Sequence, residues 1–475
     1  MNWAHLIFDI LTYFMFGYSV ILLASYIFIG TYSIGETKDY LNKNNFTDFR
    51  VLASSPYAPS VSILAPAYNE GANIIANVRS LLAIYYTNME VIILNDGSKD
   101  DSLEKLIEAY NLEKIDFYVQ YQIPSKEVRG VYKSKDPIYH KLIVVDKVNG
   151  GKADALNVGV NISSKDYIIC IDVDCVLEQD AILKMVKPFL EEKDEKIIAS
   201  GGVVRIANSC VIEDGKLVKV HLPKQYLPRL QSLEYIRAFL LGRMAWARLN
   251  GLLIISGAFG VFNKEIVIQC GGYDYNTVGE DMELVVRMRR YMEEKKIKYR
   301  VTYIPDPLCW TEAPSSFEIL RRQRNRWTRG TYETLKAHSI MFFNPKYRLL
   351  GMLSYPYWFF FELCAPIIEF GGFVFLVFQA SFGLIEWNFF VAFFCFILSF
   401  SYVYSSFSIF MEAISYNQYK RKSEVLKLLI TSFTEPFVFH PFVVWSAIEG
   451  YIDLILKEKS WGEMTRRGLG AAEAK

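Results

Sequence analysis

The chain has 475 residues, of which 52% are hydrophobic, 15% aromatic and 22% charged. This balance excludes a disordered chain, a collagen-like repeat and a small disulfide scaffold. The formal charge of +1 gives no reason to expect a nucleic-acid partner. A mean hydropathy of +0.15 is high for a soluble enzyme and low for a chain that lies wholly in lipid, so we expect a water-soluble domain joined to membrane spans.

Two uncharged runs predict membrane-spanning helices. Residues 10–34 hold no charged side chain and exceed the ~20 residues that a helical span needs. This run is too long for a signal peptide and follows no Lys or Arg, which favours a retained span. Residues 387–411 are also uncharged, and residues 353–380 are apolar apart from Glu362 and Glu369, so we expect a span in each.

The apolar stretch 426–456 is different, because six residues interrupt it: Glu435, Pro436, His440, Pro441, Glu449 and Asp453. This pattern predicts a broken or re-entrant helix that lines a cavity. Basic residues between 38 and 50, in the loop 418–427 and after residue 456 indicate that these segments and the large domain are cytosolic. The stretch 426–456 is then not one simple crossing.

Between these apolar regions, buried runs alternate with helical patterns. Short β-branched runs occupy residues 61–65, 91–94, 142–145 and 167–171, and helical spacing occupies residues 73–83, 102–110 and 153–162. Such alternation predicts a parallel α/β sheet. Ligands of these sheets bind beyond the carboxyl ends of the strands, so we expect functional residues there.

Polar residues do follow the predicted strands. Asn69 and Glu70 follow the first run and Asp96 the second. Asp172 and Asp174 follow the fourth, where two carboxylates that flank one residue can share a divalent cation, although such a pair also arises by chance. Lys152 opens a helix after two glycines, and it is either a phosphate contact or a solvated lysine.

Two later segments carry further candidates. Glu280 and Asp281 precede a helical pattern at 282–291, and Asp281 is either a helix cap or a general base. Gln323, Arg326 and Trp327 lie in a basic segment. That segment either touches lipid headgroups or offers an Arg to a diphosphate and an indole to a sugar ring. Residues 230–249 and 317–335 have an amphipathic pattern that favours helices at the membrane interface over helices in the soluble core.

Taken together, the motifs resemble those of the membrane-embedded family 2 glycosyltransferases, the cellulose, chitin, hyaluronan and poly-N-acetylglucosamine synthases. Eight motifs occur in the family's order: Asn69-Glu70, Asp96-Gly97, the Lys152 loop, Asp172-x-Asp174, Ser256-Gly257-Ala258-Phe259-Gly260, Glu280-Asp281, Trp310-Thr311-Glu312-Ala313-Pro314 and Gln323-x-x-Arg326-Trp327. The resemblance implies a Rossmann-like α/β nucleotide-sugar-binding domain of the GT-A type, with transmembrane and interfacial helices. One departure is Cys175, where the family has a small or hydroxyl residue.

The resemblance also implies a role for each motif. The donor UDP-sugar, carrying glucose or N-acetylglucosamine, is expected at Asn69, Glu70, Asp96, Lys152, Asp172, Gln323 and Arg326. Asp174 and Asp172 are expected to hold Mg²⁺ or Mn²⁺. Asp281, with Glu280, is expected to be catalytic, deprotonating the acceptor hydroxyl. Trp327, Ser256 and Gly257 are expected at the acceptor, and Trp461, Arg466 and Arg467 resemble a gating loop, unless this tail is simply solvated.

The sequence therefore predicts five regions: a span at 1–34, a cytosolic glycosyltransferase domain at 51–315, an interfacial segment at 316–345, a membrane and channel region at 353–456, and a basic cytosolic tail at 457–475. The expected activity is inverting, processive synthesis of a β-linked polysaccharide that leaves through a channel in the cell membrane. The alternatives are a non-processive enzyme that adds one sugar to a lipid acceptor, and a transporter or scaffold with a degenerate transferase domain.

Overall fold

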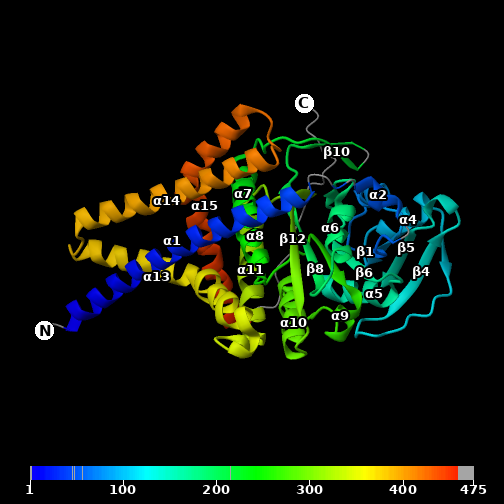
Figure 1. The fold of residues 1–475 in the computed structure, drawn as a ribbon, viewed down its shortest axis with the longest axis horizontal. Helices are drawn as coiled ribbons and strands as arrows, with labels where there is room; N and C mark the ends of the chain where they lie inside the picture. The colour runs from blue at the N-terminus through cyan, green and yellow to red at the C-terminus, as the bar shows by residue number, and fades with distance from the viewer. Residues whose placement is uncertain (1–2, 45–46, 48, 56, 214, 458–475) are drawn as a thin grey trace.

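The computed structural model describes residues 3–44, 47, 49–55, 57–213 and 215–457. They form an α/β body from which long helices project (Figure 1). A mixed sheet lies at the centre of the body. Its strands are β1 (Val61–Ala67), β2 (Met89–Asn95), β3 (Leu112–Ile115), β4 (Val128–Ser134), β5 (Leu142–Lys147), β6 (Tyr167–Ile171), β7 (Val176–Leu177), β8 (Lys196–Ile206), β11 (Phe259–Asn263) and β12 (Tyr299–Thr311). A separate hairpin pairs β9 (Val211–Glu213) with β10 (Lys216–Lys219).

The strand order is β3-β4-β5-β2-β1-β6-β11-β8-β12-β7. The four strands predicted from the sequence are neighbours, and β5, β2, β1 and β6 run parallel, as predicted. Their apolar side chains are buried on both faces, which accounts for the continuous hydrophobic runs. β11 runs antiparallel to β6 and to β8, and β12 extends the sheet parallel to β8. This second half of the sheet was not anticipated from the sequence.

Helices pack on the sheet between its strands. The three predicted helices are α3 (Ile74–Leu82), α4 (Ser102–Ala109) and α5 (Lys152–Ile162). Gly159 lets α5 lie close to the sheet, because a Cβ there would be 2.9 Å from a methyl of Leu94 and 3.0 Å from one of Leu64. The other body helices are α2 (Phe49–Ser54), α6 (Ala181–Leu190), α7 (Tyr226–Ile236), α8 (Met244–Arg248), α9 (Lys264–Gln269), α10 (Glu280–Glu294) and α11 (Phe317–Ala337).

The predicted amphipathic segment 230–249 is helical, with a π-helical stretch, η2 (Arg237–Arg243), between α7 and α8. Its apolar side chains are buried inside the protein. The segment packs on β8 from one side and on α1 (Trp3–Asn44) from the other, so it joins the body to the projecting helices. The second amphipathic segment forms α11, as its spacing predicted.

Within the part of the chain that the structure describes, four helical stretches are long and apolar enough to cross a membrane: Phe8–Asn44, Leu350–Ser381, Trp387–Ser415 and Lys422–Leu456. The second comprises η5 (Leu350–Ser354), α12 (Tyr355–Tyr357), η6 (Trp358–Leu363) and α13 (Ala365–Ser381), and the last two are α14 and α15. In Figure 1, α1, α13 and α14 project together from the body. Aromatic contacts join them, with ring centroids 5.1 Å apart for Phe8 and Phe375 and 5.0 Å apart for Tyr26 and Tyr404.

The prediction that 426–456 is broken was wrong, because α15 is one continuous helix with Pro436 and Pro441 inside it. The polar side chains of α15 form hydrogen bonds or ion pairs with neighbouring helices. The helix can therefore continue without a break in its backbone at these residues. Glu435 accepts two hydrogen bonds from Arg237, at 3.0 and 3.3 Å, and His440 lies 2.6 Å from Glu369 of α13. α15 contacts α7 and α11 of the body as well as α13 and α14, and it runs steeply across the latter two (Figure 1).

Candidate active site

Three predicted motifs meet around the side chain of Lys152. The Lys152 ammonium lies 2.5 Å from Asp172 Oδ1 and 3.8 Å from Glu280 Oε1, and it donates to the carbonyl of Gly257 at 3.2 Å. The same Gly257 donates its N–H to Asp281 Oδ2 at 2.9 Å. The backbone of Gly257 therefore links Lys152, the predicted diphosphate contact, to Asp281, the predicted base. A side chain at Gly257 would lie 3.0 Å from the ammonium, so the glycine also gives this approach room.

The charges of this cluster act on one another. Burial lowers the pKa of Lys152, but the carboxylates of Asp172 and Glu280 outweigh it and hold the pKa above its usual value. Burial raises the pKa of Glu280, the Asp281 carboxylate adds to the rise, and Lys152 opposes it. The ammonium of Lys152 and the carboxylates around it thus stabilise one another, and a bound anion or cation can change which of them are paired.

Helix α11 forms another wall of the site. It carries Gln323, Arg326 and Trp327, all of which line the same cavity as Lys152 and Asp281. Trp327 is 39% exposed and covered by the guanidinium of Arg324, which lies 4.2 Å from the ring centroid. Arg324 in turn donates two hydrogen bonds to Glu234 of α7, at 2.7 and 2.6 Å. The indole is thereby held in one orientation, with part of its ring left open to the cavity.

Two glycines fix the distance between α10 and α11. A Cβ added at Gly330 of α11 would lie 2.7 Å from the Cα of Gly279, and the reverse substitution would meet Gly330 at the same distance. Gly279 directly precedes Glu280 and Asp281, and Gly330 lies one helical turn after Arg326. This backbone contact brings the predicted base and the predicted acceptor floor to the same cavity.

The predicted nucleoside contacts lie at the ends of β1 and β2. Asn69 has a positive φ of 56° and its side chain accepts a hydrogen bond from the N–H of Lys99 at 2.8 Å. The N–H of Glu70 donates to Ser102 Oγ at 3.0 Å. Asp96 is 4% exposed and accepts hydrogen bonds from the backbone of the loop that leads to Lys152. These three residues lie at the sheet edge and are not among the residues that line the cavity beside Lys152.

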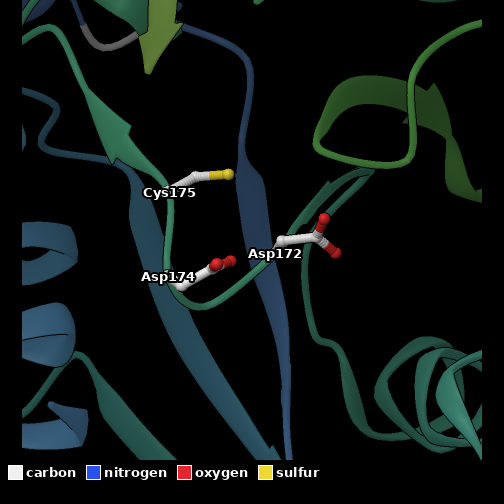
Figure 2. A group of neighbouring side chains, drawn as sticks. All are labelled: Asp172, Asp174 and Cys175. Carbon is white, nitrogen blue, oxygen red and sulfur yellow. The ribbon is translucent and has the colours of Figure 1, made fainter. Parts of the chain in front are cut away.

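Asp172, Asp174 and Cys175 lie on the loop after β6 (Figure 2). One ligand atom from each lies within 4.8 Å of the others, a separation that one cation can bridge. Two carboxylates suit Mg²⁺ or Mn²⁺. A hydrogen bond with Cys309 and burial raise the pKa of the Cys175 thiol, so the two carboxylates are the better ligands of the set. Lys152 pairs with the same Asp172 that belongs to this set.

The cavity has a volume of about 480 Å³ and reaches from the body into the membrane helices. Nine predicted site residues line it: Lys152, Asp172, Ser256, Gly257, Glu280, Asp281, Gln323, Arg326 and Trp327. It is also lined by Glu362 and Pro366, from the stretch 350–381, and by Val443 and Tyr451 of α15. Trp461, Arg466 and Arg467, the predicted gating loop, lie outside the described residues.

Sequence reasoning missed two groups that support the site. Glu234 orients Arg324, but it lies 90 residues earlier in the chain, and nothing in its local sequence marks the partnership. Lys147 lies at the end of β5, where it pairs with Asp96. A lysine at the end of a buried strand is a signal that could have identified it, since charged residues are rarely buried unless they are paired.

Residues 58–330 match the family described as "Glycosyltransferase like family 2". The poly-beta-1,6-N-acetyl-D-glucosamine synthases of Staphylococcus aureus strain COL and Staphylococcus epidermidis strain ATCC 35984 are 30% and 28% identical over 278 and 276 residues, which is 58% of this chain and 55% of each relative. The chain thus spans about half the length of these curated relatives.

Among solved structures, the mannosyltransferase PcManGT of Pyrobaculum calidifontis, in complex with GDP-Man and Mn²⁺, superposes with a TM-score of 0.48 at 15% identity, over 88% of this chain and 99% of that protein. The family match covers the whole sheet, together with every described site residue from Asn69 to Trp327. With its mixed α/β sheet of the GT-A kind and its helices apolar enough to span a membrane, the chain belongs to glycosyltransferase family 2 and is a glycosyltransferase.

Proposed function

We propose that this protein is an inverting polysaccharide synthase that transfers N-acetylglucosamine from its UDP-sugar to a growing β-linked chain and passes that chain across the membrane. The observation that carries the proposal is the cavity, which is lined by Lys152, Asp281 and Trp327 and also by Glu362 and by Tyr451 of α15. A product that grows at Asp281 can enter this cavity directly. The choice of sugar rests on the relatives, which are poly-N-acetylglucosamine synthases.

In this proposal Asp281 accepts the proton of the acceptor hydroxyl. Its two oxygens are oriented by the N–H groups of Gly257, at 2.9 Å, and Met282, at 2.8 Å. A hydroxyl group is a weak acid, so the base is needed as the bond to the sugar forms. In-line attack opposite the diphosphate inverts the anomeric carbon, and an α-linked donor gives a β-linked product. Lys152 and Arg326 bring positive charge to the departing UDP.

Asp172 and Asp174 are the residues that would hold Mg²⁺ or Mn²⁺ beside the diphosphate. When bound, such an ion neutralises phosphate oxygens and so makes UDP a better leaving group. Lys152 would then lie between Asp172 and the phosphates, where its positive charge adds to that of the ion.

We propose further that the α/β body lies in the cytosol of a cell whose plasma membrane holds α1, α13 and α14. The basic residues near the end of α1 and in the loop 418–427 support this orientation. The steep course of α15 along the body fits a helix that lines the cavity mouth rather than a fourth simple crossing.

The test is UDP release and product size for the purified full chain with Mn²⁺ or Mg²⁺, across UDP-N-acetylglucosamine and UDP-glucose, with Asp281→Asn alongside. The proposal expects one preferred donor, a polymeric product and loss of turnover in Asp281→Asn. A product with a single added sugar on lipid would support the non-processive alternative. Undiminished turnover in Asp281→Asn would remove Asp281 from the base role.

A further inference from the structure

The ammonium of Lys147 is fully buried, with 0% of its side chain exposed, at the carboxyl end of β5. It forms an ion pair with Asp96, lies 3.4 Å from Asp154 Oδ1 and donates to the carbonyl of Val148 at 2.6 Å. Both carboxylates are themselves buried, at 4% and 3% exposure. Burying a lysine costs free energy of folding unless opposite charges balance it. Stabilising the end of β5 therefore does not by itself explain why this cluster is present.

The cluster holds the loop that presents Lys152. Besides Lys147, the Asp96 carboxylate accepts the N–H of Gly150 at 2.9 Å and the N–H of Gly151 at 2.8 Å. Asn149 adds a hydrogen bond from its side chain to the carbonyl of Asp96 at 2.7 Å. Every residue from 149 to 151 is thus tied to Asp96, whose position Lys147 sets.

The backbone of this loop adopts a conformation that favours glycine. Gly151 has a φ of +86°, a conformation that side chains other than glycine rarely adopt, and it is the cap residue of α5. Lys152, the first residue of α5, then reaches Asp172 at 2.5 Å. A carboxylate has roughly four sites for donors, and three of those on Asp96 are used by Lys147, Gly150 and Gly151, so Asp96 is mainly a part of the loop's support.

We infer that Lys147 is a positioning residue for donor binding, acting through Asp96 and the loop 149–151 on Lys152. The inference rests on the proposed function in one respect, that Lys152 contacts the diphosphate of the donor. Removal of the ammonium leaves two buried carboxylates without their cation, and Asp96 must move or take up a proton. Either change loosens its bonds to Gly150 and Gly151 and displaces Lys152.

The experiment uses the full chain in detergent, with UDP and Mn²⁺ as the probe in isothermal titration calorimetry. Lys147→Met is compared with Lys184→Met, a control in which the lost lysine pairs with Asp180 at 2.9 Å and Asp306 at 3.1 Å, away from the donor loop. We expect the dissociation constant for UDP to rise at least about 10-fold in Lys147→Met and to stay within about 2-fold in the control, because the bonds of Asp96 to the loop depend on its buried ion pair.

Turnover adds a second readout. A loosened loop raises KM for the donor, and it also lowers kcat because Lys152 brings charge to the departing UDP, whereas a general loss of folded protein lowers kcat alone and leaves KM unchanged. If Lys147→Met does not fold, the double variant Lys147→Met/Asp154→Asn takes its place. This variant removes one negative charge together with the positive charge, and so reduces the charge imbalance in the buried cluster. Its affinity for UDP should be as weak, because the bond to Asp96 is still missing.

A folded Lys147 variant that binds UDP as tightly as the wild type overturns the inference. If the wild type binds no UDP, the proposed donor is wrong, and hydrogen exchange decides the inference separately. The amides of Gly150 and Gly151 should then exchange at least about 10-fold faster in Lys147→Met than in Lys184→Met, as expected for local opening of a short loop. Equal exchange in the two variants would contradict a positioning role.

Discussion

Gly330→Ala should damage catalysis without unfolding the protein. The added methyl would lie 2.7 Å from the Cα of Gly279 and 2.9 Å from its nitrogen. Ordinary contacts begin at 3.4 Å, so α11 and the start of α10 must move apart by about 0.7 Å. Both neighbours are backbone atoms, which cannot rotate away as a side chain can.

This displacement separates Asp281 from the α11 wall that carries Arg326 and Trp327. A misplacement of about 1 Å between reacting groups costs on the order of 100-fold in rate, so we expect a loss of about 10- to 100-fold in kcat. Overpacking of this kind costs about 1–3 kcal/mol of stability, which lowers the unfolding temperature by only a few degrees in a chain of this size.

The assay is UDP release at saturating donor, with thermal unfolding measured on the same samples. Gly371→Ala is the control, because a new methyl there would meet no atom of the described residues within 4 Å apart from the nearby backbone of its own helix. Wild-type turnover by Gly330→Ala, with an unchanged unfolding temperature, would refute the view that these two glycines set the spacing of the site.

Three further outcomes are expected. Trp327→Ala should raise KM for an oligosaccharide acceptor about 10-fold, near the upper range for an aromatic contact, while Trp327→Phe keeps most of the affinity. Chelation with EDTA should abolish sugar transfer, and added Mn²⁺ should restore it in the wild type but not in Asp174→Ala; full activity in EDTA would contradict the metal site. Burial raises the pKa of Glu283, but hydrogen bonds from His338 and Arg287 outweigh it and hold the pKa below its usual value. The stability that ionised Glu283 contributes is therefore present above the ordinary glutamate pKa and is lost as the pH falls through the depressed one. The unfolding temperatures of the wild type and Glu283→Gln should converge in acid, and a constant difference across pH would contradict this.

Local patterns in the sequence predicted much of this architecture. The four parallel strands are short apolar runs that end in polar residues, and the ends of such strands meet at one edge. Asp172 and Lys152 lie together near this edge, although 20 residues separate them along the chain. The spans were equally clear, because the membrane demands a long uncharged run.

The features that the sequence did not predict depend on contacts between residues that are far apart in the chain. Whether Pro436 and Pro441 break α15 depends on neighbours such as Arg237, which lies 198 residues from Glu435. The contact of Gly279 with Gly330 leaves no local mark either, since an isolated glycine in a helical pattern fits many environments. Periodicity predicts which face of an element is buried, but it does not say against which residue.

The place of α15 has a consequence for how the protein is made. Chains are synthesised from the amino end, and domains generally fold as they emerge. The α/β body is complete by residue 337, yet α11 is held from outside by α15, through hydrogen bonds from Asn325 to Asp453 at 2.6 Å and from Arg321 to Glu449 at 3.0 Å. The wall that carries Trp327 is therefore braced only after more than a hundred further residues have left the ribosome. Under the proposed function, a nascent chain that still lacks α15 has an unfinished acceptor site, so sugar transfer is delayed until α15 has packed against α11.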